Sequence, residues 1–447
     1  MMAHVFIPFP SWQGELAVVD LFASSSISIR ICGMKWSFLW MGIFLMHFTH
    51  ALKAQDYLAG VAVRDVTPSP LLPVSGGVGP SNPVTEQRGN LTVRAFALQH
   101  GASTVVFVSS DFLGFPAALG NRVRAKVKWL PADHILIGAT HTHSAPDCYG
   151  FPDGKGGNGA NPSYWNFVCD QMAGAIHAAL ASLSPVKLKI NTGEARGKIA
   201  YNAYAEQLYD PRCHVIQASS IEGKPMVTLV NYAVHPEVLG ANVGICSPDL
   251  VWPLTQRIEM EAGGVAMFMN SALGGMVTAD NRKAGAGDSR TWDECLRIGT
   301  LLADQALEIV DEANEQTPAH LKVHTRRIHL PIDSNEMLAI LKSSPLDFEL
   351  DAHRQIETTI NLIELGNAQI LTIPGEALPN IGYYLKRQMK GDHNLLFGLT
   401  NDAFGYIMTR VDWGSFRRYG YITRTSLGER TGEIVISESL KLIDQSE

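Results

Sequence analysis

The chain has 447 residues, 46% of them hydrophobic, and is therefore long enough to bury a large core. Its formal net charge of -7 argues against the basic surface that nucleic-acid binding requires. No internal repeat of the solenoid or propeller kind occurs. We therefore expect a globular protein without a nucleic-acid partner, and nothing in the sequence indicates an oligomeric state.

The first 54 residues are predicted to be an upstream extension followed by a signal peptide. Residues 34–54 combine a basic Lys35, an apolar run over residues 36–48 and a small residue, Ala54, at a cleavage site. The apolar run is short for a membrane span. We predict export, to the periplasm or out of the cell, after cleavage near Ala54, with Met34 as a candidate start. A membrane-anchoring or buried N-terminal helix is the alternative.

Five cysteines follow residue 54, at irregular spacings and without a Cys-x-x-Cys pair. This pattern predicts neither a disulfide framework nor a structural zinc site, although one bridge is compatible with export.

Strand-like and helix-like segments alternate from residue 55 onward. Apolar, β-branched runs predict strands over residues 104–111, 133–140, 225–234, 264–272, 367–376 and 394–402. Helical spacing predicts helices over residues 117–130, 161–183, 291–315 and 378–389. Residues 321–331 alternate like an antiparallel edge strand. The alternation predicts an α/β fold with helices flanking a mixed central sheet, as a single domain over residues 55–447.

Polar side chains stand where several of these strands end. They are His141 and His143, His235, Ser271, Glu376 and, a little further on, Tyr406. In open α/β sheets, ligands bind beyond the carboxyl ends of the strands. We therefore expect these six residues to lie around one cleft.

The histidines and the carboxylate in this set predict a metal site. In an extended chain, His141 and His143 point to the same side, although packing alone also explains histidines after a buried strand. His235 repeats the arrangement. Glu376 is costly to bury unless a helix N-terminus or a cation stabilises it. Two histidines and one carboxylate match the three protein ligands of a catalytic zinc.

Several segments of the sequence resemble the neutral, non-lysosomal ceramidases. They are "LAGVAVRDVTPSP", "GATHTHSAPDCYG", "YAVHPEVLG", "MFMNSALGG", "TIPGEALPNIGYYLKRQM" and "GLTNDAFGYIMTRVDWGSFRRYG", in that order. The resemblance implies that His141, His235, Glu376 and Tyr406 bind Zn²⁺, with Tyr406 either a ligand or a proton donor. It also implies that His143 handles a proton and that Ser271 is the active-site serine. The implied reaction is hydrolysis of the N-acyl bond of ceramide, a lipid amide, at a membrane surface.

Three departures from the family keep other functions open. Ala203 stands where the family has an arginine, and Gly275 stands where it has an acidic residue. The family's C-terminal immunoglobulin-like domain has no counterpart before Glu447. The alternatives are a zinc hydrolase of another N-acyl or ester substrate and a non-catalytic binding protein on the same fold.

Overall fold

The computed structural model describes residues 57–285, 287–317 and 319–446. The predicted extension, signal peptide and cleavage site lie outside the described residues. In the part that is described, no helix is long and apolar enough to cross a membrane.

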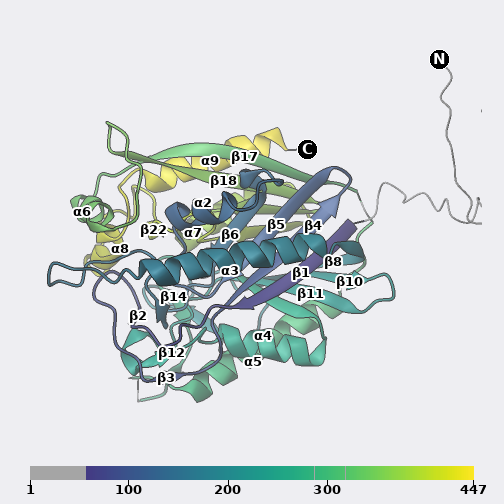
Figure 1. Cartoon of the computed structure of the whole chain (residues 1–447), viewed down its shortest axis with the longest axis horizontal. Coiled ribbons are helices and arrows are strands. Elements are labelled where there is room, and N and C mark those ends of the chain that lie inside the picture. The colour runs from purple at the N-terminus through teal and green to yellow at the C-terminus, as the bar shows by residue number, and fades with distance from the viewer. Residues whose placement is uncertain (1–56, 286, 318, 447) are drawn as a thin grey trace, which may run out of the picture. The chain divides into compact units, whose positions relative to one another are not determined.

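The larger of two main sheets has eight strands and forms the centre of the fold (Figure 1). Its pairs are antiparallel except β11 with β13 and β5 with β6, which are parallel. In spatial order the strands are β13 (Val265–Asn270), β11 (Pro225–Tyr232), β10 (Arg212–Ser220), β8 (Ser184–Glu194), β1 (Tyr57–Asp65), β4 (Thr92–His100), β5 (Ser103–Ser110) and β6 (Ile135–Ala139).

A second sheet of four strands contains the predicted antiparallel edge. Its order is β17 (Leu321–Pro331), β18 (Gln355–Leu365), β19 (Ala368–Thr372) and β21 (His393–Phe397). Since β17 pairs only with β18 in this sheet and is antiparallel to it, the edge-strand prediction for residues 321–331 is confirmed.

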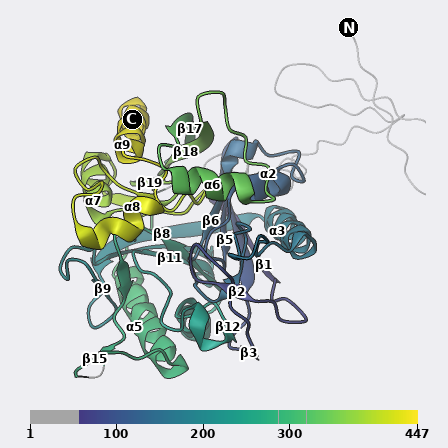
Figure 2. The same cartoon turned by 90° about the vertical axis from the view of Figure 1, so that its left-hand side faces the viewer.

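Helices cover the outer faces of both sheets (Figures 1 and 2). Helix α3 (Pro162–Ala181) packs on β1 and β4, and α4 (Val251–Glu261) and α5 (Trp292–Asp311) pack on β13 and β10 respectively. Helix α9 (Thr431–Gln445) packs on the second sheet and on α7 (Pro379–Gln388). The remaining helices of the described residues are α2 (Ala117–Arg124), α6 (Asn335–Ser343) and α8 (Gly420–Arg424).

The two sheets share a core between them, because successive side chains along a strand point to opposite faces of its sheet. On β5, Val106 and Val108 pack under α3, whereas Phe107 points to the second sheet. There it meets Phe397 of β21 edge to face, with ring centroids 5.8 Å apart. The predicted fold class, α/β with a mixed central sheet flanked by helices, is confirmed, and the second sheet adds a layer that the sequence did not predict.

Short strands and turns complete the fold near the site. They pair as β2 (Val74–Ser75) with β7 (Ala145–Pro146), β3 (Glu86–Gln87) with β12 (Ile245–Cys246), β9 (Ala200–Asn202) with β14 (Val277–Ala279), β15 (Arg282–Lys283) with β16 (Gly287–Asp288), and β20 (Glu376–Ala377) with β22 (Tyr406–Ile407). The 3-10 turns are η1 (Ala132–His134), η2 (Ala241–Val243) and η3 (Arg417–Tyr419).

Three predicted elements are clearly shorter than expected, and one of them, the strand over residues 394–402, ends at Phe397. The helix over residues 117–130 ends at Arg124, whose guanidinium turns inward to donate to the carbonyl of Ile135 and to Asn401. The strand over residues 367–376 stops at Thr372, because Pro374 cannot donate to a ladder; the chain resumes as β20 at Glu376. All five cysteines after residue 54 are buried and unpaired, so no disulfide forms among the described residues.

Candidate metal centre

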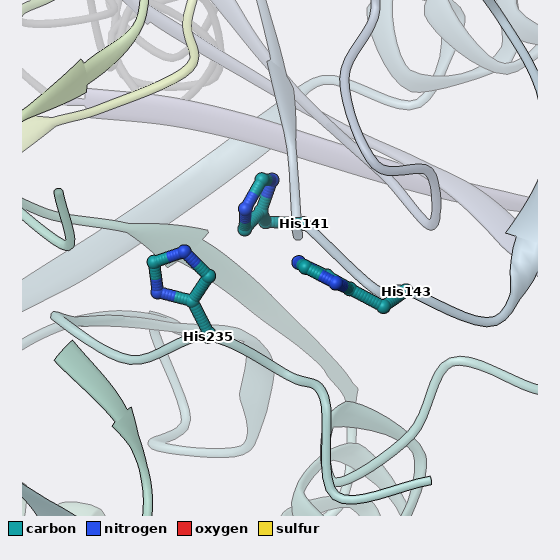
Figure 3. Close-up of side chains that lie close together, drawn as sticks. All are labelled: His141, His143 and His235. Carbon is teal, nitrogen blue, oxygen red and sulfur yellow. The ribbon is translucent and has the colours of Figure 1, made fainter. Parts of the chain in front are cut away.

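Three histidines, of which His141 and His235 are buried and His143 is partly buried, form a cluster beyond the ends of β6 and β11. One ring nitrogen of each lies within 4.8 Å of those of the other two, and Figure 3 shows the three rings turned toward one another. The ring of His141 is 4.8 Å from that of His143 and 4.7 Å from that of His235, centroid to centroid. Strands from distant parts of the chain thus bring the predicted histidines together.

His141 is oriented by the main chain. Its φ of 73° is in the left-handed region, so the extended geometry expected for the His-x-His pair is wrong at this residue. The main-chain N–H donates to the carbonyl of Phe112 at 2.9 Å, and Nδ1 lies 2.6 Å from the carbonyl of Leu113. A proton on Nδ1 satisfies that carbonyl and leaves the Nε2 lone pair facing the cluster.

His235 is fixed in the same manner. Its Nδ1 lies 2.8 Å from the carbonyl of Val277, which also accepts the His235 main-chain N–H at 2.9 Å. Its Nε2 is buried and has no hydrogen-bond partner. A second carbonyl contact thus selects the tautomer in which Nε2 can bind a metal.

Glu376 brings a carboxylate to these two nitrogens. Its Oε2 lies 3.2 Å from Nε2 of His235 and 3.7 Å from Nε2 of His141, and it too is buried without a hydrogen-bond partner. The 3.2 Å contact is short but lacks hydrogen-bond geometry. Ligand atoms about 2.1 Å from a tetrahedral zinc stand about 3.4 Å apart. The spacing and the unpartnered atoms therefore fit a bound cation, and not the N-terminus of α7, which begins three residues later.

Burial and neighbouring charges set the protonation of the cluster. Burial lowers the pKa of His141 and of His143 to about 3 each, so both are neutral near pH 7. Burial also lowers the pKa of His235, but Glu376 and then Glu237 outweigh it and the net shift is upward. Burial raises the pKa of Glu376, but His141 and His235 outweigh it, and the net shift is downward. The ionised carboxylate of Glu376 and the neutral imidazoles of His141 and His143 are in the form that binds a divalent cation, whereas His235 must be in its deprotonated form to bind one.

His143 has a partner that the sequence reasoning missed. Glu237 places Oε2 3.6 Å from Nδ1 of His143, while Nε2 of His143 is buried and unpartnered. The His143 main-chain N–H donates to the carbonyl of Pro236 at 3.1 Å, which joins the two histidine loops. The signal for Glu237 was its place two residues after His235.

Asn270 ties both histidine segments to the sheet. It ends β13, and its Nδ2 donates to the carbonyls of Thr140 and Val234 at 3.0 and 2.7 Å. Its Oδ1 accepts the N–H of Val234 at 3.2 Å. Thr140 and Val234 directly precede His141 and His235, so one buried amide fixes the spacing of the two candidate ligands.

Tyr406 is the cross-strand neighbour of Glu376 in the β20–β22 pair. Its hydroxyl lies 3.4 Å from Sδ of Met276, and burial, followed by the charge of Glu376, raises its pKa well above the usual value. It lines the same pocket as His141, His143 and Glu376. Its roles as ligand or proton donor stay predictions.

Ser271 stands apart from this pocket. Its hydroxyl accepts a hydrogen bond from Lys386 at 3.2 Å, and Ser271 is not among the pocket's lining residues. Lys386 is buried, pairs with Asp210 at 3.1 Å and lies 3.1 Å from Nε2 of His214. The structure thus brings His141, His143, His235, Glu376 and Tyr406 together and places Ser271 in a buried polar cluster beside β10. Its catalytic role stays a prediction.

An apolar pocket opens beside His141 and His143. Helix α6 contributes Met337, Ile340 and Leu341 to its wall, and Phe348 and Phe404 face it as well. Among the described residues that line it there is no arginine or lysine. Ala203 lies nearby, since its N–H donates to the carbonyl of Met276, the residue whose sulfur meets Tyr406.

Two solved structures share this fold. The neutral ceramidase from Pseudomonas aeruginosa aligns with a TM-score of 0.68 and 18% sequence identity, over 88% of this chain and 75% of that one. A ceramidase complexed with C2 aligns with the same TM-score and identity, over 88% of this chain and 76% of that one. No family model matches the chain, and no curated protein matches it. At this level of identity, the likeness establishes the fold.

Proposed function

We propose that this chain is a zinc-dependent hydrolase that cleaves the N-acyl amide bond of ceramide or a ceramide-like lipid, releasing a sphingoid base and a fatty acid. The observation that carries the proposal is the pair of unpartnered buried atoms, Nε2 of His235 and Oε2 of Glu376, beside an apolar pocket. The fold shared with two ceramidase structures supports it.

His141, His235 and Glu376 would hold the metal, with Tyr406 as the candidate fourth ligand. Bound zinc supplies a Lewis acid that acidifies a water molecule and polarises the amide carbonyl. The carbonyls of Leu113 and Val277 keep both imidazoles aimed at that position. This preorganisation lowers the cost of ligand alignment when the metal binds.

His143 would handle the proton. Its low pKa keeps it neutral, and with Nδ1 facing Glu237 its Nε2 carries a lone pair. Nε2 can therefore take a proton from the attacking water and deliver it to the leaving nitrogen. The carboxylate of Glu237 stabilises the imidazolium that forms in between, as the aspartate does in a catalytic triad.

The pocket would hold the hydrocarbon chain of the substrate. Apolar walls from α6 and from Phe348 and Phe404 favour an acyl or alkyl chain by burying it from water. Because Ala203 stands where the ceramidases that the sequence resembles have an arginine, and no arginine or lysine is among the described residues that line the pocket, a second candidate substrate is an N-acyl lipid with a less polar head group than ceramide.

The test is an acyl-substrate panel on purified, zinc-loaded protein, with N-acylsphingosine, a simple N-acyl amine and an acyl ester. His143→Ala is expected to lower kcat at least about 100-fold while zinc stays bound, because general acid–base catalysis contributes about that much. His177→Ala is the matched control, since this exposed histidine stacks on Trp129 and is not among the residues that line the pocket. Loss of zinc in His143→Ala would instead make His143 a ligand. No turnover of any substrate by the zinc-loaded protein would favour a binding protein.

We further propose that residues 1–54 are removed on export and that residues 55–447 form the catalytic domain. The basic Lys35, the apolar run and Ala54 support this proposal. Expression from Met1 and from Met34, followed by N-terminal sequencing of the exported protein, tests it. The expected mature N-terminus is near residue 55, whereas retention of the apolar run would identify an anchor.

A further inference from the structure

A short segment beside the pocket exposes apolar side chains. We name residues 410–424 the mouth segment; it includes η3 and α8. Val411 is 79% exposed, Phe416 53% and Tyr421 40%. Isolated exposed apolar residues are ordinary, but three within one short segment make this surface a candidate for an interaction.

The mouth segment is also strongly basic. It contains four exposed arginines and a single acidic residue, Asp412. Arg410 pairs with Glu429 at 3.0 Å, whereas Arg417, Arg418 and Arg424 form no salt bridge with any carboxylate in the described ranges. The Arg418 guanidinium lies 5.6 Å from the ring centre of Phe416. The segment's own residues thus sum to a formal charge of +3, with the charge of Arg410 paired by Glu429 outside the segment, on a chain whose formal net charge is -7.

The mouth segment borders the entrance of the pocket. Two of the pocket's lining residues are exposed, Val78 and Tyr421, and they therefore mark where it opens. Tyr421 belongs to α8, and its ring centre is 6.0 Å from that of Tyr406 inside the pocket. Figures 1 and 2 both show α8 close to α6, the helix that forms the apolar wall.

We propose that the mouth segment docks the protein on an anionic membrane surface, with the pocket opening toward the bilayer. Phe416, Val411 and Tyr421 would enter the level of the head groups, where amphipathic and aromatic side chains are stable. The unpaired arginines would meet lipid phosphates, with which their planar guanidinium groups form two parallel hydrogen bonds. Since the rest of the chain is negative, the bilayer repels it, and the mouth segment fixes the orientation.

The proposal that the protein docks on a membrane depends only on the exposed residues and their charge. The further point, that the bilayer delivers the substrate, rests on the proposed function. The two are separable by experiment. Co-sedimentation with phosphatidylcholine vesicles, with and without phosphatidylglycerol, measures docking alone. A short-chain, water-soluble N-acyl substrate measures the chemistry alone.

We expect the protein to bind the vesicles that contain phosphatidylglycerol and not the neutral ones, with binding that weakens as salt is raised. Arg417→Glu/Arg418→Glu should lower the vesicle affinity at least about tenfold, and Phe416→Ala should lower it severalfold. Lys128→Glu/Lys224→Glu makes the same change of charge at two exposed lysines outside the pocket lining and should keep the affinity. Unchanged thermal unfolding verifies that each variant is folded.

The proposal is overturned if the wild-type protein binds neither kind of vesicle, or if the two charge reversals weaken binding equally. It is also overturned if Phe416→Ala breaks a dimer in solution without affecting vesicle binding, since the surface would then join two copies. Failure to hydrolyse the soluble substrate contradicts the proposed function and leaves the vesicle result standing. Arg417→Glu/Arg418→Glu should hydrolyse the soluble substrate at the wild-type rate.

Discussion

Asn270 couples the sheet to the metal centre, so the variant Asn270→Leu separates the role of its amide from that of its volume. Leucine fills a similar space but forms no hydrogen bonds. The carbonyls of Thr140 and Val234 and the N–H of Val234 would lose the partners that they have in the wild-type protein. The segments that carry His141 and His235 would then no longer be held at a fixed spacing.

The size of the effect follows from these three groups. A buried polar group left without a partner costs about 1–3 kcal/mol, and partial relaxation makes the costs less than additive. We expect Asn270→Leu to lower the free energy of unfolding of the metal-free protein by about 3–5 kcal/mol. Zinc affinity should fall at least about tenfold, which corresponds to about 1.4 kcal/mol of lost alignment between the two histidines.

Urea unfolding and zinc titration against a competing chelator measure the two effects. The matched control is Asn231→Leu, because Asn231 is equally buried and donates to the carbonyls of Met269, Asn270 and Leu396, none of which precedes a candidate ligand. It should lose comparable stability and keep its zinc affinity. Equal losses of zinc affinity in both variants would refute the role given to Asn270, as would an unchanged affinity in Asn270→Leu.

Three further predictions concern the same core. Gly274→Ala places a Cβ 2.2 Å from the carbonyl oxygen of Glu376, so it should lower the free energy of unfolding in urea by about 1–3 kcal/mol and weaken zinc binding. The control is Gly174→Ala in α3, whose new Cβ meets no atom of the described residues within 4 Å apart from the backbone of its own helix, and which should leave the stability unchanged or slightly higher. Lys386→Met leaves the buried carboxylate of Asp210 without its lysine partner and should lower the free energy of unfolding by about 3 kcal/mol, measured by urea unfolding. A loss below the error of the method would show that the salt bridge with Arg212 is enough to stabilise Asp210. Zinc affinity should be constant above the raised pKa of His235 and fall about tenfold per pH unit below it, because a proton must then leave Nε2 before the metal binds. A zinc affinity that does not change between about pH 5 and pH 8 would contradict this prediction.

Several elements could be predicted because their sequence patterns are local. The runs that became β5, β6, β11 and β13 are apolar and β-branched, and α3 begins at Pro162 with Asn161 capping it, as the pattern indicates. The long strand β18 was not predicted, since Gln355–Leu365 mixes polar and apolar residues without a clear alternation. The face-to-face packing of two sheets depends on contacts such as Phe107 with Phe397, far apart in sequence.

Most residues of the candidate site could be predicted from the sequence, but the contacts that orient them could not. Apolar strands ending in His141, His235 and Glu376 were visible in the sequence, and the structure brings these side chains together. The left-handed backbone of His141 could not be read from residue types, because it results from the contacts with Phe112 and Leu113. Glu237 was overlooked since it falls in a loop whose position depends on the tertiary fold.

The most direct test of the account is the metal content of the purified protein and of His235→Ala, determined by elemental analysis after dialysis against trace zinc. We predict one zinc per wild-type chain and a large loss of zinc from His235→Ala, with His177→Ala retaining the wild-type content. Wild-type protein without stoichiometric zinc, or a His235→Ala variant with unchanged metal content, would contradict the metal centre proposed for His141, His235 and Glu376.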